Sequence, residues 1–86
     1  MPDFRFTVHD GTTEIWAKVE TLDSLAVAKA RAVDNASELL GKVDGAFWQD
    51  GRLQLDVSDA NGLRLCTILI AGLEVPSPGT RLPLLH

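Results

Sequence analysis

The sequence predicts an α+β fold of order β-β-α-β-β, with a four-stranded antiparallel sheet and one helix packed on one of its faces. Two observations predict it. Only the stretch from Ser24 to Lys42 carries apolar residues at helical spacing over several turns. The segments on both sides of this stretch alternate between apolar and polar residues, as strands with one buried face do.

The first two strands are predicted to form a hairpin. Residues 4–9 read FRFTVH, with an apolar residue at every second position, and Asp10-Gly11 then favours a tight turn. Residues 13–20 resume the alternation, with Ile15, Ala17 and Val19 on one face and Trp16 on the other. Either Trp16 is exposed on the open side of the sheet, or this strand is turned so that Trp16 faces inward.

The helix is predicted to run from about Ser24, whose hydroxyl can cap the first turn, to Lys42, with Gly41 as a stop. Small side chains at the centre of its apolar face favour close approach to a sheet. The face comprises Leu25, Ala28, Ala32, Ala36, Leu39 and Val43. Of these, we expect Leu25, Ala32, Ala36 and Leu39 to be buried, and we expect Arg31, Asp34, Asn35 and Glu38 to face solvent.

The second half of the chain is predicted to hold a loop and a second hairpin. Phe47 and Trp48 lie in a glycine-containing loop and provide an aromatic anchor. Strands are expected over residues 52–59 and 63–73, joined by a turn at Asn61-Gly62. The last strand is apolar on both faces from Cys66 onward, which is typical of a strand that is covered on both sides or that pairs at an interface.

The order of the strands follows from the direction of the chain. If every neighbour is antiparallel, the third strand must lie beside the first, which gives the order 2-1-3-4 with the fourth strand at an edge. Residues 1–74 are expected to form a single domain. Residues 75–86 are rich in proline, which cannot continue a paired strand, and we expect them to form a flexible C-terminal tail.

Composition excludes several classes of protein. The 86 residues carry a net charge of −4 with scattered basic residues, which argues against binding to nucleic acid. A single cysteine rules out an internal disulfide framework and favours a reducing, cytoplasmic location. No segment has the length of apolar sequence that a membrane span requires, so we expect no membrane association.

Three stretches together resemble a family of short bacterial proteins of unknown function. They are FRFTVHDG, SLAVAKARA and LQLDVSDANGLRLCTI, which match that family's aromatic-x-aromatic strand, Asp-Gly turn, alanine-rich helix and V-x-D-x-x-G hairpin. The resemblance covers roughly residues 4–70. The second strand departs from it, and the proline-containing tail is additional. The resemblance implies the fold, and it implies no catalytic residue that could be transferred.

No catalytic, metal or cofactor site is predicted. His9, Asp10 and Cys66 could supply a nucleophile with a base, but a cysteine within an apolar strand is usually a small buried hydrophobe. His9 and His86 are too few for a closed metal site. The carboxylates Asp10, Asp56 and Asp59 are interpreted as turn residues rather than as a calcium loop.

Large apolar side chains that the predicted core does not account for lead to two hypotheses on function. Trp16, Trp48, Ile68 and Ile70 are the candidate interaction residues. The first hypothesis is a non-enzymatic protein-interaction module that binds another protein or a second copy of itself. The alternative is an antitoxin-like regulator that binds a small partner protein.

Overall fold

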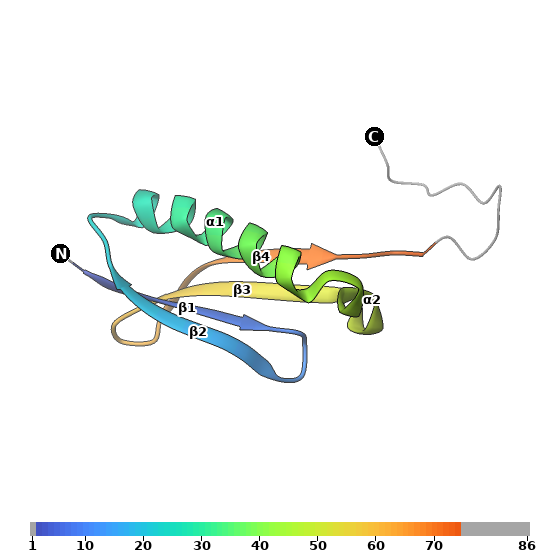
Figure 1. Cartoon of the computed structure of the whole chain (residues 1–86). Helices are drawn as coiled ribbons and strands as arrows, with labels where there is room; N and C mark the ends of the chain where they lie inside the picture. The colour runs from blue at the N-terminus through green and yellow to red at the C-terminus, as the bar shows by residue number, and fades with distance from the viewer. Residues whose placement is uncertain (1, 75–86) are drawn as a thin grey trace.

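A helix lies along one side of a four-stranded sheet in the computed structural model, which describes residues 2–74 (Figure 1). The predicted order β-β-α-β-β is confirmed. The predicted tail at residues 75–86 lies outside the described residues. The elements are β1 (Asp3–His9), β2 (Glu14–Thr21), α1 (Leu25–Val43), a 3-10 turn (Asp44–Ala46), α2 (Phe47–Asp50), β3 (Arg52–Asp59) and β4 (Arg64–Ala71).

All strand pairs are antiparallel, and the order β2-β1-β3-β4 confirms the predicted topology. β1 and β3 form the centre, and β2 and β4 form the edges. Directly paired residues share a face of the sheet. One face is covered by α1, and we call the other face, which α1 leaves uncovered, the open face (Figure 1).

The core lies between α1 and the two central strands. Phe6, Val8 and Val57 are fully buried on the helix side of the sheet, since β-strands alternate their side chains between faces. Ala28 and Ala32 are also buried, because their small side chains let the helix axis approach the strands. The predicted alanine stripe is thus confirmed, and Leu39 packs against the core from its edge.

The helix ends differ in detail from the prediction. Ser24 caps the first turn as predicted, its Oγ accepting a hydrogen bond of 3.3 Å from the amide of Val27. The expected stop at Gly41 is wrong, because Gly41 is helical and the positive φ of 51° falls at Asp44. The expectation that Leu25 is buried is also wrong. Leu25 is exposed in the first turn, and Leu22, in the link from β2, is buried instead.

β2 turns Trp16 inward, so the alternative in which Trp16 is exposed on the open face is wrong. Val8 pairs with Trp16, which places the indole on the helix side, where it packs against the core. The register shift beside His9 adds one residue to the hairpin and sets this orientation. Val19 consequently lies on the open face and is 56% exposed. Ile15, at the register shift, is 44% exposed and lines a hollow with Leu53.

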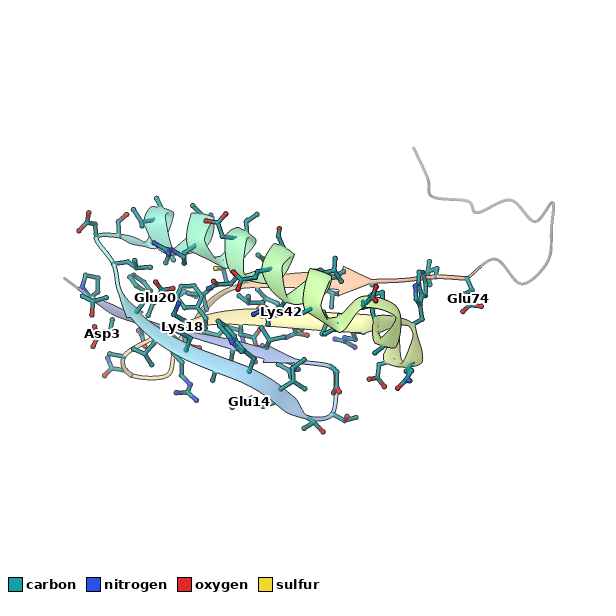
Figure 2. All side chains as sticks on the ribbon, viewed as in Figure 1. Asp3, Glu14, Lys18, Glu20, Lys42 and Glu74 are labelled. Carbon is teal, nitrogen blue, oxygen red and sulfur yellow. The ribbon has the colours of Figure 1, made fainter. Side chains whose placement is uncertain are left out.

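Charged residues fill the space between β2 and α1. Lys18 and Glu20 lie on the helix side of β2 (Figure 2). Glu20 is within 3.6 Å of Arg31 on α1, and Asn35 is half-buried one turn later. Arg31 is exposed, as expected, although it reaches Glu20. Asn35 was also expected to face solvent, and that expectation is corrected. The alanine face of α1 packs on the core, which leaves these longer side chains at the β2 margin.

The predicted aromatic loop is a short 3-10 turn followed by α2. The rings of Phe47 and Trp48 meet edge to face with centroids 5.6 Å apart. They lie over Gly72, where a Cβ atom would be 2.7 Å from the Phe47 ring, so only glycine fits without displacing the rings. The Gly72 amide also donates a 2.9 Å hydrogen bond to the Gly51 carbonyl. Together these contacts close the end of the β3–β4 hairpin.

Candidate functional site

The four candidate interaction residues do not form one patch. Trp16 lies on β2 at one edge of the sheet, and Ile68 and Ile70 lie on β4 at the other edge. Both isoleucines are on the helix side, where they are partly buried and pack against the core. Trp48 is 53% exposed on α2, against the chain that leaves β4. These residues therefore contribute mainly to the core and its margins.

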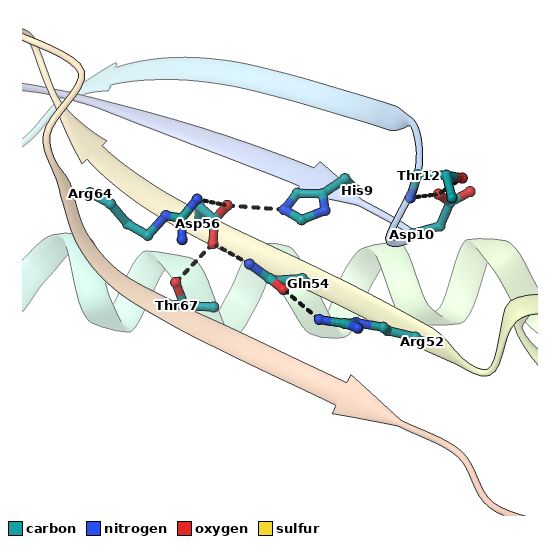
Figure 3. Close-up of polar contacts among 8 residues, drawn as sticks. All are labelled: His9, Asp10, Thr12, Arg52, Gln54, Asp56, Arg64 and Thr67. Atoms are coloured by element: carbon teal, nitrogen blue, oxygen red, sulfur yellow. Dashed lines mark hydrogen bonds and ion pairs between the residues drawn. The ribbon is translucent and has the colours of Figure 1, made fainter.

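The open face is organised around a buried carboxylate. Asp56 lies in the middle of β3, and its side chain is only 8% exposed (Figure 3). Its Oδ1 accepts hydrogen bonds from Thr67 Oγ1 at 2.8 Å and from Gln54 Nε2 at 3.0 Å. Its Oδ2 lies 3.0 Å from His9 Nε2 and 3.5 Å from the Arg64 guanidinium. The carboxylate is thus shared by partners from β1, β3 and β4.

This environment keeps Asp56 ionised. Burial raises the pKa of the Asp56 carboxyl, but the hydrogen bonds from Gln54, Thr67 and His9 and the charge of Arg64 outweigh burial and lower it below the ordinary 3.8. Since an ionised carboxylate only accepts hydrogen bonds, His9 Nε2 carries the hydrogen that lies between the two side chains. The network therefore fixes the imidazole in one orientation on the sheet.

A further arginine extends the network along β3. Arg52 Nη2 donates a 3.1 Å hydrogen bond to Gln54 Oε1, so the Gln54 amide accepts at one end and donates to Asp56 at the other (Figure 3). This chain of bonds gives the amide a single orientation. Arg52, Gln54 and Asp56 alternate with Leu53 and Leu55, which are buried on the helix side. One strand thus serves the core with one face and the polar network with the other.

Asp10 and Asp59 are turn residues, as predicted. Asp10 Oδ1 accepts from the amides of Thr13 and Thr12 at 2.9 Å and 3.0 Å, and these bonds lower the pKa of the Asp10 carboxyl. Asp59 Oδ1 accepts from the amides of Asn61 and Leu63, both at 2.9 Å. Both side chains therefore stabilise hairpin turns.

The interpretation of Asp56 as a turn residue is wrong, because Asp56 lies within β3 and contacts His9 on β1. They are 47 positions apart in the chain and meet only because β1 pairs with β3. One signal was available in the sequence. Asp56 stands between Leu55 and Val57 in the middle of a strand, and a carboxylate there needs partners on neighbouring strands.

The geometry separates the residues that could have formed a nucleophilic pair. Cys66 pairs with Val57 and lies on the helix side, whereas His9 lies on the open face. The sheet stands between the thiol and the imidazole. Among residues 2–74, no three histidine, cysteine or acidic side chains gather to hold a metal ion. Within the same residues, no helix has both the length and the apolar character needed to cross a membrane.

The outer edge of β4 is the second notable feature. From Leu65 to Leu73 the chain has no charged residue and no proline, and Glu74 follows beyond the end of the strand (Figure 2). Leu69 is 57% exposed on the open face. Within the described part of the chain, β4 pairs with β3 alone, so its outer backbone groups have no strand partner there. Beyond Arg64, this edge lacks the charges and prolines that proteins use to prevent strand pairing.

These features define a small two-layer α+β domain with one long helix, an open sheet face and, within the described residues, an edge strand that is not protected against pairing. The chain belongs to the family described as domain of unknown function DUF6894, whose sequence profile matches residues 3–71. The resemblance to a family of unknown function is thereby confirmed. The curated proteins and the solved structures gave no significant match.

Proposed function

We propose that this chain is a non-enzymatic protein-interaction module that associates with a second copy of itself through the outer edge of β4. The observation that supports the proposal is the uncharged, proline-free stretch from Leu65 to Leu73 at an edge of the sheet. Addition of a strand to such an edge provides main-chain hydrogen bonds, and the alternate side chains provide specificity.

The sequence of β4 is complementary to itself. In an antiparallel register centred on Leu69, this residue faces Leu69 of the second copy on the open side. On the helix side, Ile68 of each copy faces Ile70 of the other, which gives two β-branched pairs of the kind that stabilise sheets. The bulge at the start of β4 lies before Cys66, so the strand from Cys66 to Ala71 is regular. A two-fold axis through Leu69 produces the commonest kind of closed oligomer.

The other edge of the sheet is less suited to pairing. β2 carries Glu14, Lys18 and Glu20, and charges on an edge strand oppose sheet-to-sheet association. The register shift between Val8 and His9 also distorts the β1–β2 pair near the hairpin turn. β4 is therefore the edge that favours a second copy.

The placement of Cys66 and His9 on opposite faces of the sheet supports the non-enzymatic part of the proposal, since they cannot act as nucleophile and base on one substrate. The single cysteine supports a cytoplasmic, reducing location as a further part of it. The antitoxin-like alternative, with a different small protein as the partner, is less favoured than self-association, because the exposed edge of β4 is complementary to itself.

Leu69→Lys tests the proposal, because it places two like charges side by side at the centre of the dimer. We expect the wild-type chain to dimerise weakly, with a dissociation constant in the micromolar range, since paired edge strands bury little surface. The Leu69→Lys variant is expected to be monomeric and folded, since Leu69 projects away from the core. Sedimentation equilibrium between about 10 µM and about 1 mM measures this, with circular dichroism as the check on folding.

Val19→Lys is the matched control, because Val19 is 56% exposed on the same face but lies on β2. This variant should dimerise like the wild-type chain. A wild-type protein that stays monomeric throughout the concentration range contradicts the proposal. Loss of the dimer in Val19→Lys, with Leu69→Lys unaffected, would place the interface at the β2 edge and would also contradict the proposal. Lysines at Ile68 or Ile70 are less suitable, because both side chains pack on the core and their loss would unfold the monomer.

A further inference from the structure

Several of the arginine side chains of this acidic chain lie together on the open face. The net charge is −4, yet Arg5, Arg52 and Arg64 all lie on the open face. Asp56 is the carboxylate at the centre of that face, and it is already buried among hydrogen-bond donors. By the same pairings, Asp3 and Glu14 also lie on this face, at opposite ends of the β1–β2 hairpin, so the face as a whole is close to neutral. Its positive charge is local to the positions of the arginines.

Two of these arginines stand in one row across the sheet. Arg5 on β1 pairs with Ser58 on β3, and Ser58 pairs in turn with Arg64 on β4. Because neighbouring strands are about 4.8 Å apart, the two arginine backbones are separated by about 10 Å with the serine hydroxyl between them. Val19 on β2 pairs with Arg5 and ends the row with an exposed apolar side chain.

The nearest carboxylates leave Arg5 available. Asp3 accepts a hydrogen bond from the Thr21 hydroxyl, and Asp59 accepts from the amides of its own turn. Within the described residues, Arg5 has no acidic side chain within 4.0 Å, and its side chain is exposed. The side chain of Arg64 is 62% exposed and its guanidinium lies within 4.0 Å of one oxygen of Asp56, so it can bind a second anionic group.

We propose that the row Val19, Arg5, Ser58 and Arg64 binds an acidic segment of a partner protein. Two guanidinium groups and a hydroxyl match carboxylate oxygens, which arginine recognises through paired hydrogen bonds. Val19 adds an apolar contact at the end of the row. The buried Asp56 holds Arg64 on the open face, so part of the site is organised before the partner arrives.

An acidic protein segment fits this surface better than nucleic acid does. The Phe and Trp side chains of the described residues lie on the helix side of the sheet or on α2. Within these residues, the one ring on the open face is the His9 imidazole, which is held against Asp56, so the row itself offers no ring on which a base could stack. A chain with a net charge of −4 also repels a polyanion as a whole. A peptide in which glutamate or aspartate alternates with apolar residues has a lower charge density than nucleic acid. It also matches the row, which contains both charged and apolar side chains.

The inference rests on the proposed role as an interaction module but uses a surface separate from the outer edge of β4. The dimer experiment measures mass, whereas the experiment below measures peptide binding. A protein that dimerises without binding peptide contradicts only this inference. A protein that binds peptide as a monomer contradicts only the dimer.

Nuclear magnetic resonance titration of the full chain tests the inference. The probes are a peptide that alternates glutamate with valine, its counterpart with lysine in place of glutamate, a single-stranded oligothymidylate and inorganic phosphate. We expect saturable shifts at the amides of Arg5, Ser58 and Arg64 with the acidic peptide only. Arg5→Gln should weaken this binding by about threefold to tenfold.

Lys29→Gln removes the same charge from the exposed side of α1 and should leave the affinity unchanged. Equal weakening by both variants would show a general charge effect and would overturn the inference. Stronger binding of the oligonucleotide at the row would overturn it in favour of nucleic acid. Shifts caused by phosphate at the same concentrations would show a small-anion site, and shifts confined to α1 would place the peptide elsewhere; either result would also overturn it.

Discussion

Asp56→Ala is expected to lower the free energy of unfolding by about 3 kcal/mol. The substitution removes an ionised carboxylate whose side chain is 8% exposed. It leaves the hydrogen-bond donors of Thr67 and Gln54 without their acceptor, together with His9 and the guanidinium of Arg64. Hydrogen bonds to a charged group contribute more than those between neutral groups, and this carboxylate has four partners, of which the exposed Thr67 and Arg64 can turn to water instead. Urea denaturation followed by circular dichroism measures the change.

Asp34→Ala is the control, because Asp34 is an exposed carboxylate on α1. Its effect should be within about 0.5 kcal/mol of zero. If Asp56→Ala costs no more than this control, the carboxylate is not the organising group of the open face, and the account of the network is wrong.

The same pair of proteins tests the pKa of Asp56. The folded pKa of the Asp56 carboxyl lies below its ordinary value of 3.8, so the ionised form is favoured by folding. The stabilisation is therefore fully present above that value and is lost as the pH falls through the lower folded pKa. The difference in stability between the wild-type chain and Asp56→Ala should shrink below about pH 4. Asp10 titrates in both proteins, so its contribution cancels in this difference.

Ala32→Leu is expected to lower the free energy of unfolding by about 2 kcal/mol, within the usual range for overpacking. Ala32 is 1% exposed, and it lies on the face of α1 that meets the sheet. The larger side chain would force the helix away from β1 and β3, where the core residues Phe6 and Val57 lie. Because the helix moves as a unit, its contacts with the sheet on either side of Ala32 would weaken as well.

Ala30→Leu serves as the comparison, because Ala30 is exposed on the same helix. Leucine is nearly as good a helix former as alanine, so this change should be close to neutral. Thermal unfolding of the two variants side by side separates packing from helix propensity. An unchanged melting temperature for the Ala32 variant would show that helix and sheet are not closely packed at this point.

The correct predictions from the sequence share a physical basis. The helix face with Ala28 and Ala32 and the alternation in Phe4, Phe6 and Val8 depend on fixed side-chain periods of about 3.6 and about 2 residues. The strand order 2-1-3-4 followed from the reversal of chain direction at each connection. These properties are local, or they depend only on the order of the elements along the chain.

The errors occurred where the answer depends on how elements meet. The direction of Trp16 is set by an additional residue in the β1–β2 pairing, and a shift by one residue turns a whole strand over. Leu25 has the correct helical period but lies in the first turn, where it is exposed. Periodicity identifies the apolar side of an element, but it does not state how far along the element a neighbour reaches.

By itself, the sequence determined the elements, their order and most of the residues that fill the core, because alternation and helical spacing are recorded in neighbouring positions. Only the tertiary structure decided the open face. His9 meets Asp56, and Arg5 stands level with Ser58 and Arg64, through the registers of three strands that are distant along the chain. Those registers are set by the whole core at once, since a slip of one position would exchange the buried and exposed faces of a strand.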